Sequence, residues 1–175
     1  MKRISAALRK KAAKIRLLLL DVDGVLTDGA IIIDDRGVES KQFHVRDGQG
    51  ISLLLRSGVD VGFVTGRRSN VVRHRAKDLG VRLVYQGVAD KLVCYEKIKR
   101  DHDLNDNQIA YVGDDLIDRP VLRRVGLAVS VADGWSGLSS TVDYTTLERG
   151  GRGAVREVAE LLLNAQKKWR KLTSR

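Results

Sequence analysis

Short apolar runs alternate with segments of helical periodicity along most of the chain. Five apolar runs predict buried strands, over residues 17–20, 59–64, 81–85, 109–112 and 127–131. Apolar residues three and four positions apart predict helices between them, starting at Asp47, after the capping residue Ser69, near Lys91 and near Ala154. Because parallel strands need a crossover and a helix is the usual one, this order predicts an α/β fold with a mostly parallel sheet and helices on both faces.

The segment after the first strand departs from this alternation. Two β-rich pieces, residues 30–33 and 38–43, flank the turn residues Asp34, Asp35 and Gly37. That pattern predicts a β-hairpin. A hairpin at this place would form a flap beside any site that follows the first strand.

The spacing along the chain leaves little room for a second domain. Only the hairpin and one helix lie between Asp23 and Thr65, and the stretch from Arg67 to Asp114 holds only strand and helix crossovers. A length of 175 residues, 43% of them hydrophobic, suits a single domain with a sizeable core. We therefore expect one domain over residues 1–175, without a separate cap domain.

The net charge of +10 comes from the two ends of the chain. No acidic residue precedes Asp21 or follows Glu160, and the basic ends at residues 1–16 and 167–175 hold twelve lysines and arginines. Without those twelve, 20 basic residues face 22 acidic ones in the rest of the chain. The excess is more typical of solvated helix faces than of a nucleic-acid interface, so we expect no nucleic-acid partner.

Two further features bear on location. The lone Cys94 excludes an internal disulfide framework and a thiolate zinc site, which favours a reducing compartment. The basic start followed by four leucines imitates a targeting segment, but that run is too short for a signal peptide and far too short for a membrane span. We expect a cytoplasmic protein without a membrane partner.

Paired carboxylates follow the first strand. Asp21 and Asp23 lie two positions apart and precede Gly24, which permits a sharp turn. Such a pair suits phosphoryl transfer: one carboxylate attacks phosphorus and forms an aspartyl-phosphate, while the other protonates the leaving oxygen and later takes a proton from water. An acidic turn without catalytic work has the same pattern, so the interpretation depends on the motifs downstream.

Two weaker motifs supply hydrogen-bond donors and positive charge. Thr65 and Gly66 follow another strand, where a hydroxyl and free backbone N–H groups can bind phosphate oxygens. Lys91 begins a predicted helix and could place a compact positive charge against the phosphate and the nucleophile. Each pattern is common by itself.

Three carboxylates crowd the segment after the fourth strand. Asp114, Asp115 and Asp118 repel one another unless a cation neutralises them. Mg²⁺ takes only a few protein oxygens, so Asp21, the backbone carbonyl of Asp23 and Asp114 would suffice to hold it. Asp115 and Asp118 would bind through water or hold the loop. Because ligand sites in such sheets lie beyond the carboxyl ends of the strands, all these groups are expected at one edge.

In this order, the motifs resemble those of the haloacid dehalogenase (HAD) superfamily, phosphatases with an aspartate nucleophile and a Rossmann-like fold. The four superfamily motifs correspond to Asp21-x-Asp23, Thr65, Lys91 and Gly113-Asp114-Asp115. A capless subgroup of these enzymes releases phosphate from an eight-carbon acidic sugar on the route to lipopolysaccharide. The segments that are similar to this subgroup are residues 21–29, 44–50, 65–68 and 150–157.

The resemblance implies a Mg²⁺-dependent sugar phosphatase in which Asp21 is the nucleophile and Asp23 the general acid and base, with Thr65 and Lys91 on the phosphate. The implied metal ligands are Asp21, Asp23 and Asp114. The implied substrate contacts are Asp23, His44, Val45, Arg46, Asp47, Gly48, Ser52, Arg67, Arg75, Lys91 and Arg152. It also implies a cytoplasmic homotetramer, in which a neighbouring subunit covers a site that lacks a cap domain and the turn carrying Arg152 reaches across.

Three alternatives stay open at this point. A phosphatase for a nine-carbon acidic sugar phosphate would need the same recognition of acid and phosphate. A phosphomutase would need better exclusion of water than a capless site offers. A catalytically idle module that binds an acidic partner through its basic ends belongs to another class, and it would have no physical need for the aspartates and the lysine of the four motifs.

Overall fold

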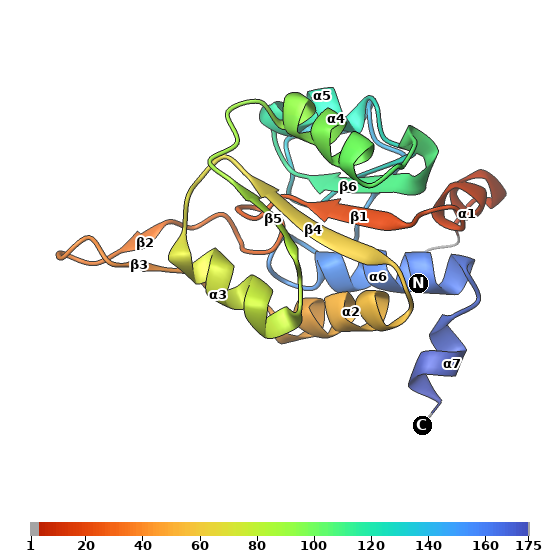
Figure 1. Ribbon diagram of the computed structural model, residues 1–175, viewed down its shortest axis with the longest axis horizontal. Coiled ribbons are helices and arrows are strands. Elements are labelled where there is room, and N and C mark those ends of the chain that lie inside the picture. Colours follow the sequence, from red (N-terminus) through yellow and green to blue (C-terminus); the bar gives the residue numbers. More distant parts are fainter. Residues whose placement is uncertain (1–3, 175) are drawn as a thin grey trace.

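Six parallel strands form the central sheet of the protein, seen here in a computed structural model that describes residues 4–174 (Figure 1). They are β1 (Leu17–Leu20), β4 (Asp60–Thr65), β5 (Leu83–Gln86), β6 (Ile109–Gly113), β7 (Leu127–Ser130) and β8 (Tyr144–Thr145). Their order is β5-β4-β1-β6-β7-β8, so β1 pairs with β4 on one side and with β6 on the other. The predicted α/β fold is confirmed, with β8 as an unpredicted edge strand.

Helices cover both faces of this sheet (Figure 1). They are α1 (Ala6–Ala12), α2 (Val45–Arg56), α3 (Asn70–Leu79), α4 (Lys91–Asp101), α5 (Arg119–Leu122), α6 (Ala154–Ala165) and α7 (Trp169–Thr173). Single 3₁₀ turns lie at Asp106–Gln108, Leu116–Asp118 and Ser136–Leu138. The core on one face includes residues of α1, α2, α3 and α6, and the core on the other includes residues of α4 and α5.

The leucines of β1 explain why the strand has no polar positions. Leu18 and Leu20 belong to the core on the α2 and α6 face, whereas Leu17 and Leu19 belong to the core on the α4 face. Each of the four is at most 1% exposed. A strand buried on both faces is read in the sequence as a continuous apolar run, and its polar residues are displaced to its carboxyl end.

Local side-chain caps start α1, α3 and α4, whereas α2 begins without one. The Ser69 hydroxyl accepts from the N–H of Val72, and Gly80 ends α3 with a φ of 75°. The predicted start of α2 at Asp47 is wrong, because His44 holds the N-cap position and Val45 is the first helical residue. The Asp47 carboxylate instead accepts backbone N–H groups at the beginning of α6, so it caps a helix far away in the sequence.

The hairpin is shorter than its sequence suggests. Its strands, β2 (Ile32–Ile33) and β3 (Glu39–Ser40), are antiparallel and only two residues long. The loop between them is held by Asp34, whose Oδ1 accepts the N–H groups of Arg36 and Val38. Figure 1 shows the hairpin projecting from the body of the protein. Its apolar side chains Ile31, Ile32, Ile33 and Val38 are 50–57% exposed.

The basic ends of the chain lie away from the hairpin. Helices α1 and α7 form near the opposite end of the protein (Figure 1), and neither was predicted as a separate element. Leu8 and Ala12 of α1 are buried, while its basic residues are exposed. Lys2, Arg3 and Arg175 of the basic ends lie outside the described residues. Within residues 4–174, no helix has the length and apolar character needed to cross a lipid bilayer.

Candidate active site

Two loops bring three acidic residues together at the carboxyl edge of the sheet. Asp21 directly follows β1, and Asp114 and Asp118 follow β6. One carboxylate oxygen from each of these three residues lies within 4.8 Å of the other two. Leu20 pairs with Val112 in the sheet register, so the two strands end side by side and deliver their next residues to the same place. Thr65, the last residue of the neighbouring strand β4, is 2% exposed at the same edge.

Asp21 is held by one backbone and one side-chain partner. Its Oδ1 accepts the N–H of Val22 at 2.7 Å, and its Oδ2 lies 2.8 Å from the Nζ of Lys91. The residue is 5% exposed. Burial, with the nearby charge of Asp118, raises the pKa of Asp21 to about 6 against the pull of Lys91.

Lys91 is the cation of the cluster. It is the first residue of α4, which Asp90 caps by accepting the N–H groups of Leu92 and Val93. Its Nζ lies 2.7 Å from Asp118 as well as 2.8 Å from Asp21. Burial would lower the pKa of Lys91, but the two carboxylates outweigh burial and raise it above its ordinary value. Lys91 therefore stays charged.

Asp118 organises the second acidic loop and is fully buried. Its Oδ1 accepts from Lys91 Nζ and from the Tyr111 hydroxyl, each at 2.7 Å. Its Oδ2 accepts the N–H groups of Asp114 and Asp115, at 3.0 and 3.2 Å. Asp118 was expected either to bind the cation through water or to hold the loop, and these contacts show that it holds the loop. Asp115 is more exposed and caps the following 3₁₀ turn through the N–H of Leu116.

The charge and the unused oxygen atoms of this cluster fit a divalent cation. Three carboxylates against one ammonium group leave two negative charges, which one divalent ion would balance. Asp114 Oδ1 is buried without a hydrogen-bond partner, so it is free to be a ligand. Burial, followed by Asp21 and Asp118, raises the pKa of Asp114 to about 8. A Cβ atom at Gly24 would collide with the Asp114 carboxylate, so the glycine is required here. Oxygen ligands of this kind suit Mg²⁺.

This arrangement predicts that pH and Mg²⁺ affect stability together. A carboxyl with a raised folded pKa stabilises the folded protein at low pH, and that contribution is lost as pH rises through the folded value. We expect the metal-free protein to lose thermal stability from about pH 4, where both carboxyls ionise in the unfolded chain, up to about pH 8, the raised pKa of Asp114; the share of Asp21 is complete by about pH 6. Mg²⁺ should raise the Tm more at pH 8 than at pH 6, because protons compete for its ligands. Scanning fluorimetry in EDTA and in Mg²⁺ measures both effects.

Asp114→Asn is the control for this experiment. It removes one titrating ligand, so both the pH dependence of the metal-free Tm and the Mg²⁺ effect should shrink. An equal rise in Tm with Mg²⁺ at pH 6 and at pH 8 in the unchanged protein would contradict the prediction.

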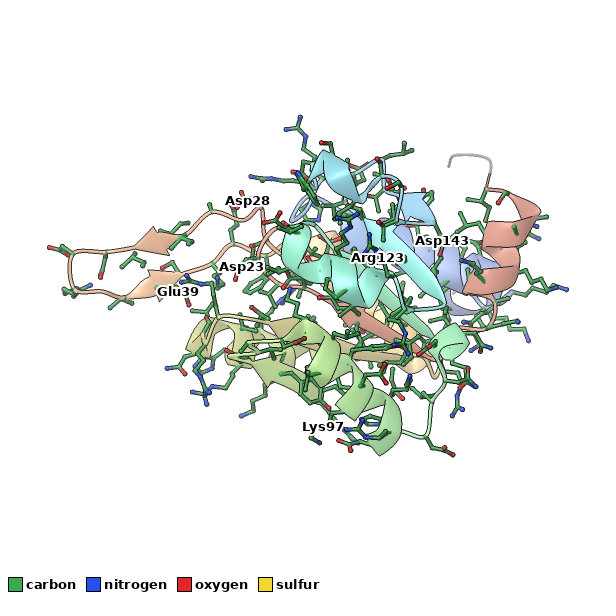
Figure 2. The ribbon with its side chains drawn as sticks, turned by 90° about the horizontal axis from the view of Figure 1, so that it is seen from above. Asp23, Asp28, Glu39, Lys97, Arg123 and Asp143 are labelled. Carbon is green, nitrogen blue, oxygen red and sulfur yellow. The ribbon has the colours of Figure 1, made fainter. Side chains whose placement is uncertain are left out.

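Asp23 faces the base of the hairpin rather than the acidic cluster (Figure 2). Lys41 Nζ donates to its Oδ1, and Arg67 Nε lies 3.9 Å from its Oδ2. Glu39 contacts both cations, at 3.3 Å from Lys41 and 3.2 Å from Arg67. Sequence reasoning included Arg67 but missed Lys41 and Glu39. They lie two positions apart, in β3 and directly after it, but only the folded hairpin reveals which groups they contact.

The other expected substrate contacts are not gathered in one place. Val45 is 82% exposed, and Ser52 lies half-buried within α2. Arg75 pairs with Asp78 and stacks over Phe43. Their contact with substrate stays a prediction.

Three more of these residues lie against other parts of the same chain. Asp47 is 1% exposed, and its carboxylate accepts from Gly153 and Arg156 backbone N–H groups. His44 lies beside it, with Nδ1 3.9 Å from Asp47 Oδ2. Gly48, also buried, has the Arg75 guanidinium where a Cβ would be. Direct contact of any of them with a substrate stays a prediction.

The glycine-rich turn before α6 packs on the loop that carries Asp21 and Asp23. Gly151 N–H donates to the carbonyl of Val25, and a Cβ at Gly150 would collide with the backbone of Gly24. Arg152 pairs with Asp28 of the same chain at 3.1 Å. It also lines a cavity of about 370 Å³ together with Arg46. The turn therefore supports the first acidic loop of its own chain.

A parallel α/β sheet with these acidic loops and a lysine at one edge defines the protein as a HAD-superfamily hydrolase. A solved structure from Legionella pneumophila, assigned to subfamily III A of these hydrolases, has a TM-score of 0.93 and 44% identity, and the match covers 96% of this chain and 92% of that one. No protein-family model matches the chain.

Named relatives place the chain more narrowly. The 3-deoxy-D-manno-octulosonate 8-phosphate phosphatase KdsC of Yersinia pestis is 50% identical over 159 residues, which are 91% of this chain and 85% of the relative. A crystal structure of this phosphatase from Moraxella catarrhalis, in complex with a magnesium ion, a phosphate ion and a KDO molecule, has a TM-score of 0.94 and 40% identity. That match covers 95% of this chain and 96% of the other. The chain belongs to the 3-deoxy-D-manno-octulosonate 8-phosphate phosphatase family.

Proposed function

We propose that the protein is a Mg²⁺-dependent phosphatase that hydrolyses 3-deoxy-D-manno-octulosonate 8-phosphate to the free sugar acid and phosphate. The single observation that carries this proposal is the buried cluster of Asp21, Lys91, Asp114 and Asp118 at the carboxyl edge of the sheet. Relatives that share about half of its residues have this activity by name, and one related structure holds magnesium, phosphate and the sugar product together.

The first step transfers the phosphoryl group to the protein. Asp21 attacks phosphorus and the bond to the sugar oxygen breaks, while Asp23 gives its proton to that departing oxygen. Lys91, paired with Asp21, aligns the nucleophile and balances charge on the phosphoryl oxygens, with the Thr65 hydroxyl as a further donor. Asp21 and Asp114, with the Asp23 backbone carbonyl, would hold Mg²⁺, whose role when bound is to neutralise charge on the phosphoryl group.

The second step returns the protein to its starting state. Asp23, now a carboxylate, takes a proton from water as the water oxygen attacks the phosphorus of the aspartyl-phosphate. The bond between phosphorus and Asp21 breaks, and phosphate leaves. Asp21 ends as a free carboxylate and Asp23 ends protonated, each as it was at the start.

A panel of sugar phosphates tests the proposed substrate. We expect phosphate release from 3-deoxy-D-manno-octulosonate 8-phosphate to exceed release from a nine-carbon acidic sugar phosphate and from neutral hexose phosphates, and to stop in EDTA. Comparison with a neutral sugar phosphate measures how much the substrate carboxylate contributes to the rate of phosphate release. Arg67 is the residue that we expect to bind this carboxylate. Faster release from the nine-carbon compound would replace the proposed substrate with that one.

The assembly and location follow from the same proposal. We propose that the protein is cytoplasmic. We also propose that it is a homotetramer, because a site without a cap domain needs a cover against water and the apolar hairpin beside it is exposed. Ile31, Ile32, Ile33 and Val38 are the surface that a neighbouring subunit would cover. Light scattering on the preparation used for the substrate panel gives the particle mass that supports or excludes this assembly.

A further inference from the structure

Lys41 is a buried cation on an otherwise exposed arm. Its side chain is 1% exposed, whereas Ile32 and Val38 on the same hairpin are at least half exposed. Its Nζ donates to Asp23 Oδ1 and lies 3.3 Å from Glu39 Oε1. Burying an ammonium group is unfavourable unless charged partners lie close to it. The lysine is therefore fixed between these two carboxylates.

Glu39, labelled on the hairpin in Figure 2, links this lysine to the body of the protein. The Ser69 hydroxyl donates to Glu39 Oε2, and Arg67 Nη2 lies 3.2 Å from Oε1. The Ser69 bond is the largest cause that lowers the pKa of Glu39, and Arg67 and Lys41 add to it. Glu39 thus stays a carboxylate that attracts the ammonium group. Since Ser69 is the N-cap of α3, the chain of contacts ends on a rigid element.

The two oxygen atoms of Asp23 have different surroundings. Oδ1 accepts the Lys41 hydrogen bond, while the charged neighbour of Oδ2 among residues 4–174 is the more distant Arg67 Nε, at 3.9 Å. One oxygen is therefore tied down and the other stays available to carry a proton. A carboxyl held in this way cannot rotate freely about its last torsion, which keeps its proton directed toward one point in space.

We propose that Lys41 is a positioning residue that holds Asp23 in the orientation for protonating the leaving oxygen. This inference rests on the proposed function, in which Asp23 is the general acid. In the step concerned, the proton passes from Asp23 Oδ2 to the leaving oxygen as the bond between phosphorus and that oxygen breaks. Lys41 keeps its own protons throughout.

Two phosphate esters without a sugar test the role of Lys41. The p-nitrophenolate ion leaves without a proton, whereas the phenolate of phenyl phosphate leaves far better when an acid protonates it. For Lys41→Met in the full-length protein with Mg²⁺, we expect kcat/KM to fall about 100-fold with phenyl phosphate and less than about threefold with p-nitrophenyl phosphate. The value of kcat/KM depends only on the steps up to the phosphorylation of Asp21. Hydrolysis of the aspartyl-phosphate in the second step therefore does not affect it.

Two further variants separate positioning from folding. Lys41→Arg keeps the charge and should restore the phenyl phosphate rate to within about tenfold of the unchanged protein. Arg36→Met alters the hairpin at its tip, where Arg36 pairs with Asp34, and should leave both rates unchanged. Equal losses on both esters in Lys41→Met, or no loss on either, would overturn the proposal. Wild-type protein that cleaves both esters but not the eight-carbon sugar phosphate would contradict the proposed substrate alone.

Discussion

Replacing Asp21 by asparagine is expected to lower kcat by about 10⁴-fold or more while the protein stays folded. An amide cannot form the acyl-phosphate bond, and the neighbouring carboxylates have other roles: Asp118 is tied by four hydrogen bonds, Asp23 accepts from Lys41, and Asp114 is the expected ligand of Mg²⁺. The measurement is phosphate release at saturating Mg²⁺. Acid quenching with labelled substrate should trap phosphate on the unchanged protein and none on the variant.

The local contacts explain why this variant should fold. The amide oxygen can still accept the Val22 N–H, and Lys91 keeps Asp118 as its partner. Burial and the Asp118 charge raise the pKa of Asp21, which means that the ionised carboxylate is costly in the metal-free protein. Removing that charge offsets the lost contact with Lys91. Asp35→Asn, on the exposed hairpin turn, is the control and should keep full activity; turnover within tenfold of wild type in Asp21→Asn would exclude Asp21 as the nucleophile.

The positions of Asp21, Thr65 and Asp114 could be predicted because each depends on a single local rule. An apolar run becomes a buried strand, and the next polar residue falls at its carboxyl end. Parallel strands then bring those ends to one edge without further information. A different local rule, the one for helix starts, failed at Asp47, where a carboxylate was expected to start its own helix and instead caps α6.

Lys41 and Asp118 illustrate what the local rules leave out. Lys41 lies 18 positions from Asp23, directly after a strand of only two residues, and its burial depends on how the hairpin folds back on the site. Asp118 lies 27 positions from Lys91 and meets it only because α4 and the loop after β6 pack together. Neither contact has a periodicity or a spacing that a single sequence could reveal. In each contact a lysine and a carboxylate that are distant in the sequence form a buried or half-buried ion pair.

Asp118→Asn is expected to destabilise the protein by about 3 to 5 kcal/mol, the scale of breaking a buried ion pair by changing one partner. All four groups around this carboxylate are hydrogen-bond donors: Lys91 Nζ, the Tyr111 hydroxyl, and the N–H groups of Asp114 and Asp115. An asparagine amide must turn its NH₂ toward one of the two pairs. Either the backbone pair or the lysine then faces a buried donor without an acceptor, which costs more than a missing bond.

This substitution also has a favourable electrostatic effect, and the balance decides the outcome. Removing the Asp118 charge relieves repulsion that raises the pKa values of Asp21 and Asp114, so the metal-free protein gains there. In the presence of Mg²⁺ this electrostatic gain is small compared with the cost of placing the asparagine NH₂ group against buried donors, because the bound ion already relieves the repulsion. We therefore expect the Tm to fall by roughly 6 to 20 °C in Mg²⁺, and by less in EDTA. Asp115→Asn is the matched control: asparagine caps a turn as well as aspartate, so its Tm should not change. An unchanged Tm in Asp118→Asn would show that the stability of the fold does not depend on the four hydrogen bonds that this carboxylate accepts.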